Sequence, residues 1–226
     1  MNAKEAAAQR AVKFVQDGMT LGLGTGSTSA YMIQALGARV KQEGLKVRAV
    51  PTSERSRLMA IELGIPVLDL NEAGTLDLAI DGADEVDHSL NLIKGGGGAL
   101  LQEKLVAAAA KEFIVICDEG KKVNALGQFP LPVAIIPFGW KTTTKRIESY
   151  CNDFSLRMSK NDPHNPFVTD DGLYILDLKM GSISDPTVLE KSLKLLVGVA
   201  EVGLFCNMAS RVIVGYEGGK TEIITG

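Results

Sequence analysis

The sequence of 226 residues is poor in histidine, with only His88 and His164. A Ser-His-Asp triad would have to use one of these two, and a histidine-rich zinc site is nearly excluded. The three cysteines, Cys117, Cys151 and Cys206, share no metal-ligand or redox spacing, and nothing requires an oxidising compartment. Any catalysis therefore has to depend mainly on other side chains.

Long apolar runs and clusters of basic residues are missing as well. The formal net charge is −3 and the basic residues are dispersed, which argues against nucleic acid or an anionic membrane surface as a partner. No stretch is long and apolar enough to span a bilayer, and residues 1–10 lack the apolar core of a secretory leader. We therefore expect a cytoplasmic globular protein without nucleic-acid or membrane partners.

Helical and strand patterns alternate over the first half of the chain. The patterns predict helices over 3–15, 28–42, 53–63 and 100–110, and strands over 19–23, 47–50, 66–70, 76–80 and 113–117. Such alternation is typical of parallel βαβ units, so we expect an α/β fold with a doubly wound parallel sheet.

The character of the sequence changes after Lys122. Residues 128–137 hold three prolines, a composition typical of a linker or an edge strand. Helices predicted over 142–150 and 185–196 and strands over 155–158 and 173–178 indicate a small α+β domain. Strands over 212–215 and 221–225, joined by a Glu217-Gly218-Gly219 turn, are expected to return to the first sheet. We predict a larger domain over 1–127 and 206–226 and an inserted smaller domain over 128–205.

Three glycines, Gly22, Gly24 and Gly26, lie between a predicted strand and helix and precede Ser27 and Thr28. Such a loop lets backbone N–H groups approach an anion, and the helix N-terminus adds a favourable dipole. A dinucleotide fingerprint fits poorly, because Ser27 occupies the place of its third glycine and no acid follows the second strand. The loop is interpreted as a phosphate site, and the alternative is a tight turn that binds nothing.

Four carboxylates lie within seven residues, at Asp81, Asp84, Glu85 and Asp87. Their mutual repulsion lowers stability unless something offsets it. Asp81 and Asp84 follow an apolar strand, at the end where open α/β sheets bind ligands. One interpretation is that this pair binds the hydroxyls of a sugar and acts as acid and base on it. The other is that the pair binds magnesium. We expect Asp87 and Glu85 to be solvated acids of the loop.

Lys94 is followed by four glycines, Gly95–Gly98, and then by a predicted helix that carries Glu103. Glycines let the backbone come close to a ligand, and Lys94 can stabilise an anion that develops on a substrate oxygen. Glu103 can carry a proton between adjacent carbons. The alternatives are a surface charge for Lys94 and a dipole-complementing acid for Glu103. Lys121, after the strand 113–117, is a candidate phosphate ligand.

At these residues the chain closely resembles the type A family of ribose-5-phosphate isomerases, over nearly its whole length and in family order. Two departures are minor: Gly98 stands where the family commonly has alanine, and Cys117 lies in the strand before Asp118. The motifs are G-T-G-S-T (24–28), D-G-A-D-E (81–85), K-G-G-G (94–97), E-K (103–104), D-E-G-K (118–121), F-P-L-P-V (129–133) and V-G-L-F (202–205).

The resemblance implies that the chain interconverts ribose 5-phosphate and ribulose 5-phosphate, in the non-oxidative pentose phosphate pathway and without a metal or organic cofactor. It implies a Rossmann-like domain interrupted by a ferredoxin-like α+β domain that helps to build a homodimer or homotetramer. Glu103 is then the base that works through a cis-enediol. We assign ring opening to Asp81, substrate hydroxyls to Asp84 and the enediolate oxygen to Lys94. The implied substrate contacts are Thr25, Gly26, Ser27, Thr28, Asp81, Gly82, Ala83, Asp84, Lys94, Gly95, Gly96, Gly97 and Lys121, with Lys4 near the phosphate.

Two rival functions come from related folds. A non-catalytic sugar-phosphate sensor would be expected to carry a helix-turn-helix segment and a basic surface, and this chain has room for neither. An isomerising sugar-phosphate deaminase would usually use a histidine in ring opening, but His88 and His164 lie outside any matching motif. The sequence therefore predicts an aldose-ketose isomerase.

Overall fold

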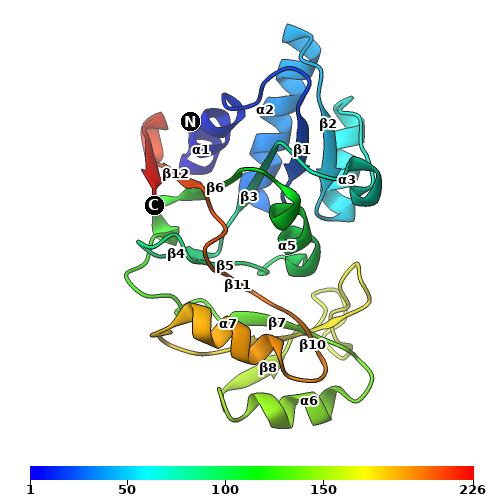
Figure 1. Cartoon of the computed structure of the whole chain (residues 1–226), viewed down its shortest axis with the longest axis vertical. Coiled ribbons are helices and arrows are strands. Elements are labelled where there is room, and N and C mark those ends of the chain that lie inside the picture. The colour runs from blue at the N-terminus through cyan, green and yellow to red at the C-terminus, as the bar shows by residue number, and fades with distance from the viewer. The chain divides into compact units, whose positions relative to one another are not determined.

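The computed structural model describes all 226 residues, Met1–Gly226, and contains two compact units (Figure 1). Unit 1 comprises Met1–Ala83, Gln102–Lys122 and Met208–Gly226, and unit 2 comprises Asp84–Leu101 and Val123–Asn207. The sequence places residues 84–101 in the larger domain, whereas the structure groups them with unit 2. None of the helices combines the length and the apolar character needed to cross a bilayer.

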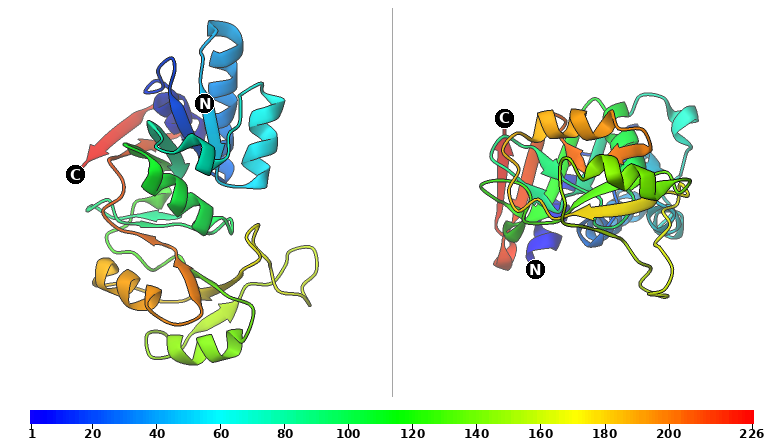
Figure 2. Two further views of the ribbon diagram at one scale, coloured as in Figure 1. Left: turned by 45° about the vertical axis from the view of Figure 1, so that its right-hand side comes forward. Right: turned by 90° about the horizontal axis from the view of Figure 1, so that it is seen from below.

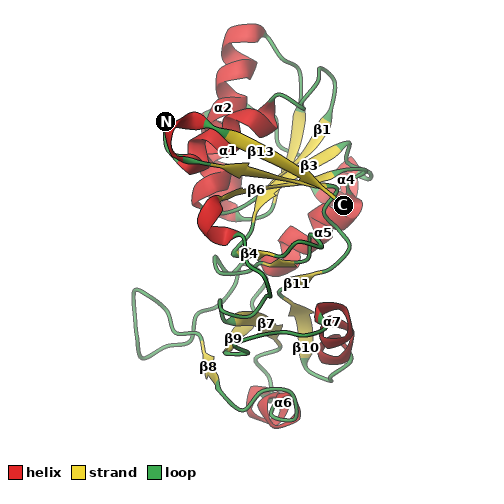
Figure 3. Cartoon of the chain, turned by 90° about the vertical axis from the view of Figure 1, so that its left-hand side faces the viewer, coloured by secondary structure: helices red, strands yellow, loops and turns green.

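Unit 1 is built on a six-stranded sheet in the order β13-β12-β6-β3-β1-β2 (Figure 3). All neighbouring strands are parallel except β13, which runs antiparallel to β12. This confirms the predicted α/β class with a parallel sheet. The strands are β1 (Thr20–Leu23), β2 (Arg48–Pro51), β3 (Leu78–Gly82), β6 (Phe113–Asp118), β12 (Arg211–Gly215) and β13 (Thr221–Thr225). The helices are α1 (Ala3–Val12), α2 (Ser27–Glu43), α3 (Glu54–Glu62), α4 (Leu70–Ala73), α5 (Leu100–Ala109, in unit 1 from Gln102 on) and the short 3-10 turns η1 (Glu119–Lys121) and η2 (Glu217–Gly219).

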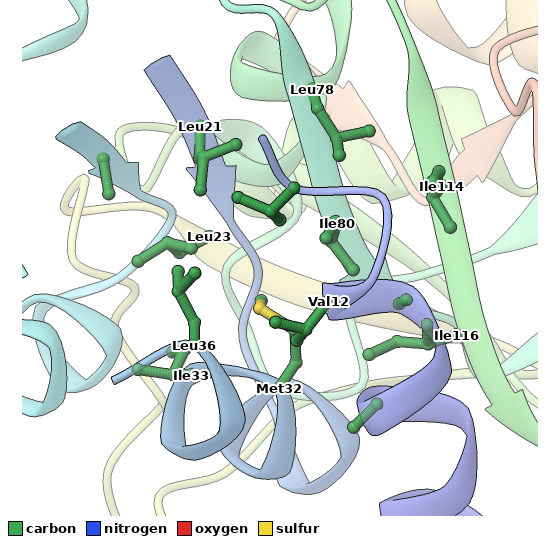
Figure 4. Packing of buried hydrophobic residues seen from close by; sticks show 14 of the residues in the cluster. Val12, Leu21, Leu23, Met32, Ile33, Leu36, Leu78, Ile80, Ile114 and Ile116 are labelled. Carbon is green, nitrogen blue, oxygen red and sulfur yellow. The ribbon is translucent and has the colours of Figure 1, made fainter. Parts of the chain in front are cut away.

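Helices α1 and α2 cover one face of this sheet. Side chains alternate between the two faces of a strand, so Leu21 and Leu23 of β1 point toward the same helices as Leu78 and Ile80 of β3 (Figure 4). Burial of this apolar surface is the main force that holds the helices on the sheet. The same buried cluster includes Val12, Met32, Ile33, Leu36, Ile114 and Ile116.

Helix α5 lies against the opposite face of the sheet, over Gly22. A Cβ atom at Gly22 would lie 2.4 Å from Cγ1 of Val106 and 2.9 Å from Cβ of Ala79. Only glycine therefore lets α5 approach β1 this closely. Gly22 is a packing residue inside β1, and its predicted membership of the anion-binding loop is wrong.

Unit 2 contains two antiparallel sheets, in the orders β10-β7-β9-β8 and β11-β5-β4 (Figure 2). The sequence predicts this α+β character, but not the small three-stranded sheet. The strands are β4 (Glu85–Val86), β5 (Leu92–Ile93), β7 (Leu131–Ile135), β8 (Phe154–Leu156), β9 (Tyr174–Leu178), β10 (Val199–Val202) and β11 (Leu204–Phe205), and the helices are α6 (Trp140–Ile147) and α7 (Pro186–Lys194).

Strand β7 is a central strand, although its prolines predict a linker or an edge strand. The carbonyl of Pro132 accepts a hydrogen bond from the N–H of Gly203 at 2.7 Å. The N and the C=O of one residue in an antiparallel strand point to the same side. The nitrogen of Pro132 therefore faces the segment that contains Gly203. The β7–β10 ladder already ends at the Val133–Val202 pair. The missing N–H of Pro132 therefore removes no hydrogen bond of that ladder.

The strand predicted over 66–70 is wrong. Only Val67 forms a bridge, to Ala49, and Leu70 already begins α4. Asp69 caps that helix by accepting a hydrogen bond from the N–H of Asn71 at 2.7 Å. The capping acid ends the extended segment before a strand can form.

Candidate active site

The loop 24–28 joins β1 to α2, at the carboxyl end of β1. Gly26 has φ 113° and directly precedes the first residue of α2, Ser27, so a glycine is required there. The first N–H groups of a helix have no partner within the helix, and the helix dipole favours an anion beside them. The loop therefore has the geometry of an anion site.

Asp81, near the end of β3, holds this loop in place. Its Oδ1 accepts hydrogen bonds from the N–H of Thr25 at 2.9 Å, the hydroxyl of Ser29 at 3.0 Å and the N–H of Gly82 at 2.7 Å. The residue is only 3% exposed, and a Cβ at Gly24 would lie 1.9 Å from the same oxygen. Gly24 thus makes room for the carboxylate, and the carboxylate orients the loop.

Four hydroxyl groups at Thr25, Thr52, Ser53 and Ser56, here called the hydroxyl cluster, meet beside the loop. Oγ1 of Thr25 lies 2.7 Å from Oγ1 of Thr52 and 2.7 Å from Oγ of Ser53. Ser56 donates to the carbonyl of Gly24 at 2.7 Å. The last three residues are buried, so these contacts are shielded from water and fix the side chain of Thr25.

Sequence reasoning missed the hydroxyl cluster. It examined the residues after the second strand only for an acid that could bind a ribose hydroxyl of a dinucleotide, and found none. The available signal was the T-S-x-x-S run directly after β2, since Ser53 also caps α3 by accepting the N–H of Ser56 at 3.2 Å. β2 is the parallel neighbour of β1, so residues that follow the two strands meet at one edge of the sheet.

Two lysines of unit 1 were predicted near a phosphate. Nζ of Lys4 donates to the hydroxyl of Ser27 at 3.0 Å, which places Lys4 at the loop. Asn2 caps α1 through the N–H of Glu5 at 2.8 Å and also donates to the hydroxyl of Tyr31 at 3.0 Å, so the start of α1 is tied to α2. Lys121 ends the short turn η1 that follows β6, at the predicted carboxyl end.

Glu103 is the fourth residue of α5 and is 4% exposed. It lies three residues before Val106, which packs over Gly22, and residues three apart share one face of a helix. The carboxylate is therefore on the buried, sheet-facing side of α5. Because burying a carboxylate costs free energy, this position favours a role beyond complementing the helix dipole.

Lys94 of unit 2 is buried as well, with 2% exposure. Its N–H donates to the carbonyl of Gly203 at 2.8 Å, and its Nζ lies 5.4 Å from the centre of the Phe205 ring. A cation over a ring face is attracted to it, so the ammonium group is held in place. The alternative of a surface charge is wrong.

Three of the four glycines after Lys94, Gly95, Gly96 and Gly98, are required by close contacts or by positive φ angles within unit 2. The N–H of Gly96 donates to Oδ2 of Asp84 at 2.8 Å, and a Cβ at Gly96 would lie 2.6 Å from Oδ1 of the same residue. Gly98 has φ 90°, and a Cβ there would lie 2.5 Å from the ring of Phe167. Gly95 has φ 100°. The fourth glycine of the run, Gly98, therefore has a packing role.

The other two acids of the segment have structural roles in unit 2. Glu85 is 4% exposed and accepts hydrogen bonds from the N–H groups of Gly127 at 2.7 Å and Phe129 at 2.6 Å. The prediction that Glu85 is a solvated loop acid is wrong, because sequence reasoning missed the β4 strand that points it inward. Asp87 accepts from the N–H groups of Ser89 and Asn91, each at 2.9 Å, and forms the turn between β4 and β5.

These contacts bear on which chemistry is possible. Oδ1 of Asp81 accepts hydrogen bonds from N–H and O–H donors, and Oδ2 of Asp84 accepts the N–H of Gly96. No group of three or more His, Cys, Asp or Glu side chains is arranged to hold a metal ion. Burial raises the pKa of the Cys117 thiol to about 12, so this cysteine is not a nucleophile at neutral pH.

The two units divide the predicted site residues between them. Unit 1 brings together the loop, Asp81 and Lys4 through direct hydrogen bonds. Unit 2 brings Asp84 onto the glycine run through Gly96. Unit 1 contains Lys4, Thr25, Gly26, Ser27, Thr28, Asp81, Gly82, Ala83, Glu103 and Lys121, and unit 2 contains Asp84, Lys94, Gly95, Gly96 and Gly97.

Several known proteins match nearly the whole chain. The family model of ribose 5-phosphate isomerase A (phosphoriboisomerase A) matches residues 48–219. Ribose-5-phosphate isomerase A of Bacillus mycoides is 52% identical over 98% of this chain and 99% of its own. A solved D-ribose-5-phosphate isomerase in complex with phospho-erythronic acid is 42% identical, covers 100% of both chains and has a TM-score of 0.95. The isomerase from Methanocaldococcus jannaschii is 39% identical over 99% of this chain and 98% of its own, with a TM-score of 0.94.

Proposed function

This chain belongs to the ribose 5-phosphate isomerase A family, and from this premise we propose how its residues carry out the reaction. The enzyme interconverts D-ribose 5-phosphate and D-ribulose 5-phosphate. The proposal concerns the step that moves a proton between C1 and C2 and the residues that hold the substrate. Its main support is the buried Glu103, an acid that the fold keeps out of bulk water.

The phosphate group binds at Thr25–Thr28, with Lys4 and Lys121 as its cations. Backbone N–H groups at the start of α2 and the hydroxyls of the loop supply donors for the phosphate oxygens. The hydrogen bond from Lys4 to Ser27 supports this assignment, because it keeps the ammonium beside the loop. The phosphate lies far from the reacting carbons, but its binding energy can still be used in the transition state.

Asp81 assists opening of the furanose ring, and Asp84 holds the substrate hydroxyls. Sugar phosphates are largely cyclic, whereas the isomerisation needs a free carbonyl. A carboxylate at the carboxyl end of β3 can accept the proton of the C1 hydroxyl. The bond between C1 and the ring oxygen then breaks, and the ring oxygen takes up a proton. Because Oδ1 of Asp81 receives three donors from unit 1, this carboxylate has one fixed orientation.

Lys94 stabilises the oxygen that becomes negative in the cis-enediolate. A fixed cation in a water-poor site is worth far more to a developing charge than the same cation in water. The burial of Lys94 and its contact with Phe205 support this role. So does the ligand of the 42% identical relative. Phospho-erythronic acid has a carboxylate next to a hydroxyl-bearing carbon, which resembles the planar, negatively charged enediolate.

Glu103 is the single base. It takes the proton from C2 of the open-chain aldose while the C1–C2 double bond forms and the C1=O electrons move onto O1. A proton then passes from O2 to O1, the C2=O bond forms, and the proton held by Glu103 goes to C1 to give the ketose. One carboxylate can serve both carbons because they are adjacent. No oxidant or cofactor is needed, since the electrons move only between C1 and C2 of one molecule.

The chain forms a homodimer or homotetramer through unit 2, which corresponds to the smaller domain that the sequence predicts. The support is an apolar edge of unit 2, formed by Ile136, Phe138, Leu195 and Val197, which are 46% to 94% exposed. The two loops that carry these residues are adjacent, because the N–H of Ile136 donates to the carbonyl of Gly198 at 2.9 Å. Exposed apolar patches of this kind often mark protein contacts.

A cytoplasmic location likewise stays a prediction.

Turnover of ribose 5-phosphate in the presence of a metal chelator tests the proposed function. We expect full activity, because the proposed chemistry uses only side chains. Activity that disappears with chelator and returns with magnesium would show that Asp81 and Asp84 act as metal ligands. A chain with no turnover under either condition would contradict the function itself.

A further inference from the structure

Arg157 of unit 2 binds the backbone of the glycine run. Its Nη1 donates to the carbonyl of Gly95 at 2.9 Å and to the carbonyl of Gly96 at 3.3 Å. Arg157 directly follows β8, and its N–H continues the ladder with β9 by donating to Ile175 at 2.8 Å. The guanidinium group therefore extends from a sheet, which is a rigid support for the loop.

Asp177 of β9 holds the guanidinium group from the other side. Its two carboxylate oxygens accept from Nε of Arg157 at 2.9 Å and from Nη2 at 2.5 Å. Both side chains are about four-fifths buried, so water weakens this two-point contact less than it weakens a surface ion pair. The pair leaves Nη1 of Arg157 pointing at the two glycine carbonyls.

One peptide unit is held at both ends by this arrangement. The carbonyl of Gly95 accepts from Arg157, and the N–H of Gly96 in the same peptide donates to Asp84 at 2.8 Å. Glycine has little conformational preference of its own, so these contacts, together with the Gly98 N–H that donates to the same Gly95 carbonyl at 3.0 Å, decide how the peptide is turned. No peptide bond in the chain is cis. In the next trans peptide, the carbonyl of Gly96 is drawn to Arg157, so the N–H of Gly97 must point away from it.

We propose that Arg157, oriented by Asp177, is a positioning residue for the reaction, because it fixes the peptides after Lys94 so that the Gly97 N–H is presented to a substrate oxygen. This inference rests on the proposed function and on the substrate contacts that the family resemblance implies for Lys94–Gly97. Arg157 itself touches only the loop. Without Arg157 the glycine run keeps only the Gly96–Asp84 and Gly98–Gly95 hydrogen bonds. Its peptides would then sample more conformations, and the free energy of ordering them would add to the reaction barrier.

Steady-state kinetics and amide hydrogen exchange of Arg157→Ala, Arg157→Lys and Asp177→Asn test the proposal. Arg157→Ala is expected to lower kcat on the order of 10- to 100-fold, since small misplacements in an active site cost that much. Inhibition by inorganic phosphate should stay unchanged, because the proposed phosphate loop belongs to unit 1. Amides of Gly96–Gly98 should exchange faster. Arg157→Lys should recover part of kcat, because one ammonium cannot bind Asp177 at two points and both carbonyls at once.

Lys179→Ala is the matched control, since it removes an ion pair of the same unit, with Asp153 at 3.0 Å, that does not contact the glycine run. It should leave kcat and the exchange of Gly96–Gly98 unchanged. Unchanged kcat in a folded Arg157→Ala protein, or a loss of kcat without faster exchange in the loop, overturns the proposal. If Arg157→Ala does not fold, Asp177→Asn decides by the same two criteria. A parent protein that does not turn over ribose 5-phosphate instead contradicts the proposed function, while the exchange rates still report on Arg157.

Discussion

The carboxylate of Asp81 occupies the space that a side chain at Gly24 would need, with Oδ1 at 1.9 Å from the position of a Cβ atom. The same oxygen receives the N–H of Thr25, so the glycine and the acid together determine the shape of the loop. Neither partner can change without displacing the other.

Gly24→Ala is therefore expected to lower kcat/KM for ribose 5-phosphate by about 100-fold or more, because the added methyl group displaces the carboxylate and the loop together. Gly44→Ala is the control. Gly44 ends α2 with φ 71°, and nothing lies within 4 Å of an added Cβ, so this variant should lose about 1 kcal/mol of stability and keep its activity. Equal kinetics for Gly24→Ala and the parent would show that the loop tolerates a displaced Asp81.

The hydroxyl cluster gives a second prediction. Ser56→Ala removes the donor to the carbonyl of Gly24 and should weaken binding of inorganic phosphate by about 1 kcal/mol, or roughly fivefold in Kd. Ser149→Ala makes the same chemical change at an exposed position, where the hydroxyl donates to the carbonyl of Arg146, and should leave Kd unchanged. Competition experiments with inorganic phosphate measure both values. Identical Kd values in the two variants would remove the cluster from phosphate binding.

Asp77 gives a prediction about pH. Its hydrogen bond with Lys111, and next the N–H of Thr20, hold the pKa of this carboxyl below its usual range. The stability that it contributes is therefore present above the unfolded pKa of about 4 and is lost as the pH falls through the lower folded value. A third of the side chain is exposed, so Asp77→Asn should cost less than about 1 kcal/mol at pH 7.

Urea unfolding at pH 7 and in acid measures this difference, which should shrink as the pH falls below 4. Asp153→Asn is the comparison variant, since that acid is 67% exposed and pairs only with Lys179 among the side chains. It should change stability less at pH 7. A difference for Asp77→Asn that stays constant down to acid pH would show that the lost hydrogen-bond geometry matters and the charge does not.

Lys94→Ala should lower kcat by about 100-fold and change KM much less, because the charge that Lys94 opposes appears mainly in the transition state. Its buried contact with Phe205 also stabilises the fold, so the melting temperature of each variant has to be measured alongside. Lys145→Ala, at an exposed lysine of α6 in the same unit as Lys94, is the matched control and should keep kcat. A rise in KM at constant kcat would assign Lys94 to ground-state binding.

The sequence predicts much of unit 1 because its signals are local. Apolar strands that alternate with helical patterns predict the βαβ units, and the glycines after β1 predict the loop. Glu103 and Lys94 carry motif signals, so both were candidates before their burial was known. The hydroxyl cluster had only the T-S-x-x-S run after β2 as a signal, and the Arg157–Asp177 pair had none. Each depends on residues from separate segments that meet only in the folded chain.

The errors have the same physical origin. Glu85 reads as one of four neighbouring acids, and only the short β4–β5 hairpin turns it toward the N–H groups of Gly127 and Phe129. Gly22 reads as a member of a glycine loop, but the packing of Val106 requires it. Pro132 argues against a central strand unless the side to which its nitrogen points is known. In each case a contact distant in sequence decides between two local interpretations.

Glu103→Gln is the most direct test of the chemistry. The amide keeps the shape of the side chain and its ability to form hydrogen bonds, but it cannot accept a proton from carbon. General-base catalysis is typically worth about a hundred- to ten-thousand-fold in rate, so turnover should fall by that order while ribose 5-phosphate still binds. The C2 hydrogen of bound substrate should then not exchange with solvent deuterium, which NMR of the recovered sugar measures. Glu112→Gln is the control, because Glu112 is an acid of the same unit that pairs with Arg211. This variant should exchange like the parent.

Exchange and turnover near the parent level in Glu103→Gln would show that another group removes the proton. Asp81 would then be the next residue to substitute, because it is the other buried acid of the site in unit 1.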